Sequence, residues 1–301
     1  MRIAMSRAEK IYQVAAHLIV ILVALVCLIP CLYVVSISVT PYAVLSLKGG
    51  YRLIPPHVSL DAYRTILASG EIINGFLVST LRVVVGTSLH LAVCSAAGYA
   101  LSKRYLPGYR ILMTLVLVTF LFGPGLIPYY LVVRSVHLLN SFWVYVIPGA
   151  AGAWSIFVFR QFFMELPPEL EEAARLDGAS ELDILLRVIL PLSGPVYAAL
   201  GLFNAVGHWN DYMTAVIFVP NPDLQPIANV LQKVLTQQSR LLMDASMQLD
   251  PSKLSISAWQ QIPSLGLQMA TVVVSVIPIL LVYPFLQKYF VKGMLTGAIK
   301  G

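Results

Sequence analysis

Long apolar runs dominate the pattern of hydrophobic and polar positions along the chain. Six runs are longer than about 18 residues, which is enough to cross roughly 30 Å of hydrocarbon as a helix. No strand-like alternation accompanies them, and a backbone in lipid must satisfy its own hydrogen bonds, so we expect helices. The predicted fold is an all-α, polytopic membrane protein with six transmembrane helices, at residues 12–39, 75–101, 111–133, 142–163, 192–219 and 266–289.

Composition agrees with this pattern. Of the 301 residues, 58% are hydrophobic and 11% are charged, and the mean hydropathy is +0.80. Such a chain has too little polar surface to cover a water-soluble globule. The first run is too long for a signal peptide and lacks a small-residue cleavage site, so we expect an uncleaved anchor. Nothing marks a second soluble domain, and residues 1–301 are expected to form a single transmembrane domain.

Lysines and arginines accumulate on one side of the predicted spans. They lie in the two tails and in the loops after the second and fourth spans, whereas the longer loops on the other side carry fewer. Because basic loops are retained in the cytoplasm, both termini are predicted to be cytoplasmic. Segments 41–73 and 220–265 are then extracytoplasmic. The net charge of +6 reflects this topology, and we expect no nucleic-acid binding.

Half of the carboxylates, seven of 14, fall between Glu165 and Asp183, in the cytoplasmic loop between the fourth and fifth spans. The prolines at 167 and 168 predict a helix start. The spacing of Glu165, Glu169 and Glu172 places these three carboxylates along one face of that helix.

A bend is predicted after this acidic helix. Gly178 suits the left-handed position that ends a helix, and Ser180 with Asp183 resembles a capping box for a second helix. We expect the second helix to run to Leu190 and to stop at Pro191. The product is a helix-turn-helix elbow over residues 165–191 at the membrane surface.

The elbow resembles the EAA loop of bacterial ABC importer permeases. That pattern is EAA, three residues, G, nine residues, then I, any residue, L and P. Glu172-Ala173-Ala174, Gly178 and Leu190-Pro191 match it, and Val188 stands where the pattern has Ile. Segments 125–128, 138–140, 157–163 and 295–301 are also similar to the MalG-like half of a carbohydrate-importing permease pair, a type I (MetI/MalG-like) permease fold.

The resemblance implies a permease subunit, not an enzyme, that moves an oligosaccharide across the bacterial inner membrane by alternating access. Its expected partners are a MalF-like second permease, a homodimeric cytoplasmic ATPase that binds the ATP and Mg, an extracytoplasmic sugar-binding protein and membrane lipid. No Walker-type phosphate loop occurs in the sequence, so no cofactor is expected on this chain. The implied coupling residues are Glu172, Ala173, Ala174, Asp177, Gly178, Leu190 and Pro191.

Polar residues inside a span are costly and usually face a cavity or a neighbouring helix. They are candidates for the substrate pathway, in which aromatic rings stack on sugars and a few polar groups bind hydroxyls. Arg82 would suit a carboxylated sugar, and segment 208–211 resembles a subgroup associated with uronate-containing oligosaccharides such as alginate or aldouronate. The candidates are Arg82, Asn204, His208, Trp209, Asn210, Asp211 and Tyr212.

Other interpretations compete with these. The pathway residues equally suit interfacial anchoring and hydrogen bonding between helices, and the elbow has the alternative of a solvated acidic loop. A secondary transporter or channel that is not coupled to an ATPase would also be polytopic, but it has no need of the elbow. His208 and Asp211 share a helix face, yet further metal ligands are lacking, so no metal site is expected.

Overall fold

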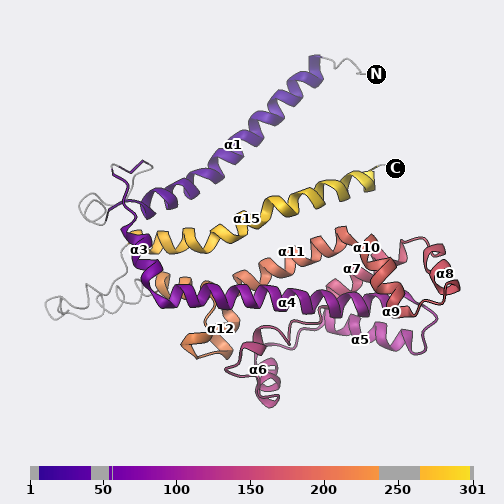
Figure 1. The fold of residues 1–301 in the computed structure, drawn as a ribbon. Coiled ribbons are helices and arrows are strands. Elements are labelled where there is room, and N and C mark those ends of the chain that lie inside the picture. The colour runs from indigo at the N-terminus through magenta and orange to yellow at the C-terminus, as the bar shows by residue number, and fades with distance from the viewer. Residues whose placement is uncertain (1–6, 42–53, 56, 237–264, 299–301) are drawn as a thin grey trace. The chain divides into compact units, whose positions relative to one another are not determined.

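The computed structural model describes residues 7–41, 54–55, 57–236 and 265–298 (Figure 1). All regular structure in these ranges is helical, as predicted. The chain divides into two compact units. The first comprises Met1–Ser69 and Lys233–Val276, and the second comprises Gly70–Gln232 and Ile277–Gly301.

The first unit contains α1 (Arg7–Ser38) and α3 (Asp61–Ala68), and α15 (Leu265–Ala298) begins in it. Within α1, the segment Ile11–Ser38 is strongly apolar, yet its most apolar window has no buried residue. An exposed apolar helix of this length is suited to lipid or to another apolar helix. The Ser38 hydroxyl at the end of α1 lies 2.6 Å from the Tyr63 hydroxyl of α3.

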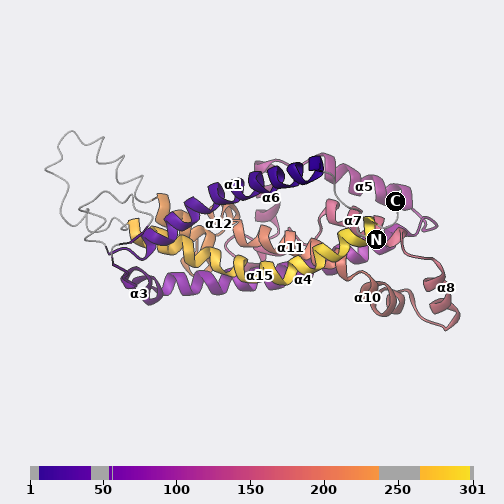
Figure 2. The ribbon, with the colours of Figure 1, turned by 90° about the horizontal axis from the view of Figure 1, so that it is seen from above.

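In the second unit, the long helix α4 (Gly70–Ser102) packs against α7 (Ala153–Met164) and α11 (Gly194–Asn210). Figures 1 and 2 both show these helices side by side. Close approach of α4 and α7 depends on Gly98, because a Cβ there would lie 2.7 Å from Cβ of Phe159. The core at this contact is fully buried and apolar, with Cys94, Phe159, Ile184, Ile189 and Leu200 at 2% exposure or less.

A second cluster of buried side chains surrounds shorter elements of the same unit. It includes Val133, Val144, Tyr145 and Phe218. Elements that contribute to it are α6 (Leu126–Ser135), η1 (Phe142–Tyr145), α12 (Met213–Phe218) and η3 (Pro222–Leu224). The helix α5 (Tyr109–Leu121) packs instead against the first cluster.

Three of the six predicted spans are continuous helices, namely 12–39, 75–101 and 266–289, which fall in α1, α4 and α15. The prediction of continuous helices was wrong for the other three. Span 111–133 breaks between α5 and α6 at the Gly-Pro-Gly of residues 123–125, where Gly125 has φ +72°. Span 142–163 begins as a 3-10 turn, and α7 starts only at Ala153.

The third interrupted span, 192–219, is broken at Asp211 between α11 and α12. Among the described residues, three helices are long and apolar enough to cross a membrane, and a fourth span is possible if Glu181–Leu192 and Gly194–Asn210, bent by 84°, count as one. Average hydropathy missed the breaks because it measures apolarity and gives no weight to the conformations of glycine and proline.

We expect Gly98→Ala to destabilise the protein by about 1–3 kcal/mol, because the new methyl group would be forced against Phe159 and the backbone of α7. Gly70→Ala is the matched control on the same helix, since nothing lies within 4 Å of a Cβ there. Thermal unfolding of the purified proteins in detergent would test this. Equal unfolding temperatures for the two variants would contradict the packing argument.

Candidate functional site

The first arm of the elbow is α8 (Glu169–Leu176), which starts directly after Pro168. It ends at Leu176, and Asp177 and then Gly178 follow, the glycine with a φ of +81°. The amide of Gly178 donates to the Arg175 carbonyl at 3.0 Å, and the amide of Ala179 donates to the Ala174 carbonyl at 3.0 Å. This pair of bonds is a Schellman motif, in which glycine avoids the strain of a left-handed residue. The predicted role of Gly178 as a helix end is confirmed.

The second arm runs through α9 (Glu181–Asp183), the π-helical η2 (Ile184–Ile189) and α10 (Leu190–Leu192). The Ser180 hydroxyl caps it as predicted, accepting a hydrogen bond from the Asp183 amide at 3.2 Å. The predicted stop at Pro191 was wrong, because Pro191 lies in the first turn of α10, where a missing N–H is tolerated. Glu165 was also misplaced, since it follows α7 and does not belong to α8.

The two faces of α8 differ in exposure. Glu169, Glu172 and Ala173 are exposed, and Leu176 is 89% exposed, so an acidic and apolar face points away from the unit. Among the described residues Glu172 has no ion-pair partner. Ala174 instead packs at the edge of the core. The predicted coupling residues therefore lie on both faces, with Glu172 and Ala173 free to meet a partner.

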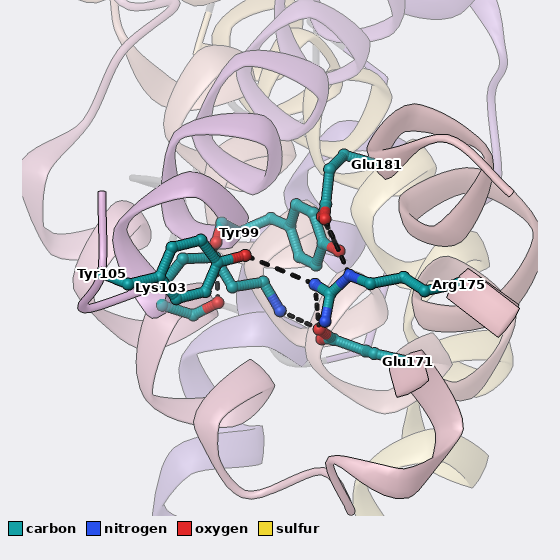
Figure 3. A network of polar contacts seen from close by, with 7 residues as sticks. Tyr99, Lys103, Tyr105, Glu171, Arg175 and Glu181 are labelled. Carbon is teal, nitrogen blue, oxygen red and sulfur yellow. Dashed lines mark hydrogen bonds and ion pairs between the residues drawn. The ribbon is translucent and has the colours of Figure 1, made fainter. Parts of the chain in front are cut away.

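The inner face of α8 is held by a network of charges (Figure 3). Glu171 forms ion pairs with Lys103 and with Arg175, the latter at 3.3 Å, although its side chain is only 12% exposed. Arg175 Nε donates to Glu181 at 2.9 Å, and the Tyr99 hydroxyl donates to the same carboxylate at 2.8 Å. The bond to Glu181 raises the pKa of Arg175 above its ordinary value, which further favours the cationic guanidinium.

The second candidate site is built around the break between α11 and α12. Arg82 of α4 is 2% exposed, and its Nη1 donates to the backbone carbonyl of Asp211 at 2.6 Å. Its Nη2 forms an ion pair with the Asp211 carboxylate. That carboxylate also accepts hydrogen bonds from the amide of Thr214 at 3.1 Å and from its hydroxyl at 2.6 Å. Asp211 therefore ends one helix and caps the next.

A cavity of about 230 Å³ opens beside this ion pair. The predicted pathway residues Asn204, His208 and Asp211 line it together with Arg82, as expected for positions spaced by four and three on one helix face. Further lining residues are Tyr129, Val144, Tyr145, Pro148, Gly149, Gly207 and Thr214.

The other three pathway candidates do not line this cavity. The Trp209 ring packs edge-on against Phe76, with 5.4 Å between ring centroids. Asn210 is exposed and Tyr212 is partly exposed at the start of α12. The spacing of Trp209 and Asn210 from Asn204 and His208 places these two on other faces of the helix. Tyr212 follows His208 by four residues and would share its face in a continuous helix, but the break at Asp211 puts it at the start of α12 and out of the cavity lining.

Sequence reasoning missed Tyr129 and Tyr145 as cavity residues. The centroid of the Tyr145 ring lies 4.6 Å from the Arg82 guanidinium carbon. The Tyr145 hydroxyl donates to the Leu224 carbonyl at 2.9 Å. Both tyrosines come from interrupted spans, and only the course of the chain after each break brings them to α11. His90, another polar residue of α4, contacts the Gly149 carbonyl and the Ser155 hydroxyl at 2.8 Å each and joins helices.

The comparisons with known proteins decide the family. Residues 91–296 match the family described as binding-protein-dependent transport system inner membrane component. The chain belongs to this family. It is therefore a multi-pass inner-membrane permease subunit of an ABC transport system, and a subunit of this kind is not itself catalytic. The resemblance to carbohydrate importer permeases is confirmed.

Several relatives of the chain have assigned substrates. It is 38% identical to the polygalacturonan/rhamnogalacturonan transport system permease protein YtcP of Bacillus subtilis (strain 168), over 97% of this chain and 99% of the relative. It is 25% identical to the arabinooligosaccharides transport system permease protein AraQ of the same organism, over 97% of each chain. A solved bacterial ABC transporter involved in import of the acidic polysaccharide alginate matches with a TM-score of 0.82 and 27% identity, covering 96% of this chain and 99% of that chain.

Replacing only one partner of the Arg82–Asp211 pair should lower the free energy of unfolding more than replacing both partners. Asp211→Asn leaves the buried Arg82 charge uncompensated, and we expect it to cost about 3 kcal/mol or more of stability. Arg82→Gln leaves the Asp211 carboxylate, whose side chain is 31% exposed, and should cost less than that. The double variant should cost clearly less, because no lone charge remains. Thermal unfolding of the intact protein in detergent measures the difference. Arg64→Gln is the control, because its pair with Asp61 is more than 80% exposed on both sides.

Proposed function

We propose that the chain is the MalG-like permease half of an ATP-driven importer of acidic oligosaccharides. The observation that carries this proposal is near full-length similarity both to a polygalacturonan/rhamnogalacturonan permease and to an alginate importer. Both of those proteins handle acidic polymers. In this proposal a second permease completes the path, and an extracytoplasmic binding protein delivers the sugar. A homodimeric ATPase, which holds the ATP and Mg, works on the cytoplasmic side, where both termini lie.

The cavity supports a role in contacting sugar. Tyr129 and Tyr145 supply aromatic surface, and Asn204 supplies an amide whose oxygen has no hydrogen-bond partner in the described chain. A volume of about 230 Å³ is below the roughly 300–1,000 Å³ of a typical small-molecule site. That size suits one wall of a path that a second permease completes.

The charge of the cavity bears on how an anion would be selected. Arg82 is already paired with Asp211, so this wall carries no excess positive charge from that pair. We therefore assign Arg82 to positioning of the helix break, and selection of an acidic sugar to the partner permease or the binding protein. A sugar carboxylate would have to displace Asp211 to reach the guanidinium.

The substrate class can be tested with the intact complex, purified with its ATPase and binding protein and reconstituted in liposomes. We expect oligogalacturonates or alginate oligosaccharides to stimulate ATP hydrolysis more than neutral arabino-oligosaccharides of the same length. Stimulation by the neutral sugars alone would contradict the acidic class. Absence of any bound ATPase would contradict the importer and favour a secondary transporter or channel.

The exposed face of α8 supports docking onto the ATPase, with Glu172 pairing to a basic group there. Glu172→Lys should lower sugar uptake at least tenfold, because like charges would meet at the contact, while the protein remains in the membrane. Glu165→Lys makes the same charge change outside α8 and serves as the control. Uptake assays with quantified membrane levels provide the measurement, and normal uptake by Glu172→Lys would remove the assigned role.

A further inference from the structure

Apart from the chain link to α7 and the burial of Ile184 and Ile189 in the apolar core, two further attachments join the elbow to the rest of the second unit. One attachment is covalent, since the chain continues from the second arm through α10 into α11 with a bend of 84°. The other is the charge network of Figure 3, which ties α8 to the end of α4 through Glu171 and Lys103. The ammonium group of Lys103 also lies 4.5 Å from the centre of the Tyr99 ring, so Lys103 is held from two directions.

Both attachments lead to the same place in the cavity wall. Along α4, the 21 positions from Lys103 back to Arg82 correspond to about 31 Å of helix at 1.5 Å per residue. Along the chain, α11 ends at Asp211. Because Arg82 binds Asp211, the elbow, α4, the ion pair and α11 form a closed loop of rigid elements and polar joints.

The covalent attachment is the less regular of the two. It contains the π-helical segment Ile184–Ile189 and the 84° bend at Ser193, which interrupt the hydrogen-bond pattern of a straight α-helix. In contrast, α4 is one continuous helix of 33 residues. A displacement at the end of α4 would therefore reach the cavity along one unbroken helix, provided that the network at that end stays intact.

We propose that the pair formed by Lys103 and Glu171 is a coupling joint, through which movement of the elbow reaches the cavity by way of α4. The inference rests on the proposed function, because it requires an ATPase that moves the elbow. Lys103 and Glu171 are positioning residues, since neither needs to touch the sugar or the nucleotide. Glu171 faces inward, so its role differs from that of the outward Glu172.

The test measures the number of sugars imported per ATP hydrolysed by the intact reconstituted complex. Lys103→Met removes the charge and keeps much of the apolar stem, and we expect this ratio to fall roughly fivefold or more, the lower end of the range for coupled sites. Glu171→Gln should give the same result. Lys103→Arg, which keeps the cation, should restore most of the ratio. Arg104→Met is the matched control, because Arg104 is exposed and has no ion pair among the described residues.

The outcomes separate this inference from simpler roles. An unchanged ratio in Lys103→Met and Glu171→Gln would overturn it. Loss of the ATPase from the purified Lys103→Met complex would also overturn it, because the network would then only shape the docking surface. A wild-type complex whose ATP hydrolysis ignores every sugar would instead refute the proposed function itself. A fall in the ratio for Lys103→Met with full ATPase content, and recovery in Lys103→Arg, supports the joint.

Discussion

The need to satisfy backbone polar groups wherever an apolar helix breaks governs this structure. In hydrocarbon an unpaired carbonyl costs several kcal/mol, so each break requires a donor. Arg82 donates to the Asp211 carbonyl between α11 and α12. At the bend before α11, the Ser193 hydroxyl donates to the Ile189 carbonyl at 2.6 Å, and past α12 the Gln225 amide donates to Val219 at 2.6 Å. This requirement accounts for three of the buried polar residues of the second unit, namely Arg82, Ser193 and Gln225.

The cavity follows from the same constraint. The chain turns at Asp211 between α11 and α12, and the cavity opens beside this break. Arg82 donates to the backbone at that break, and the Asp211 carboxylate neutralises its charge. The Tyr145 ring lies beside the Arg82 guanidinium. The result is a wall with aromatic faces and hydrogen-bonding groups but little net charge.

The elbow shows how one acidic segment serves two purposes. Glu171 and Glu172 are neighbours, yet successive helix positions point about 100° apart, so one faces the unit and the other faces outward. The inner carboxylate is neutralised by Lys103 and Arg175, and the outer one stays unpaired in the described chain. Leu176 adds an apolar contact to the outer face at 89% exposure. The short helix therefore exposes both charge and apolar surface on one side, while its other side is anchored.

The sequence by itself determined the helical class, the membrane location, the elbow with its turn at Gly178 and the cap at Ser180. These features depend on local properties, namely apolar run length, left-handed glycine and side-chain capping, which are legible from a few neighbouring residues. Only the tertiary structure decided where the spans break, that Arg82 faces Asp211 across 129 positions of sequence, and that Tyr129 and Tyr145 join them. Such pairings depend on which helices pack together, and neither hydropathy nor local spacing contains that information.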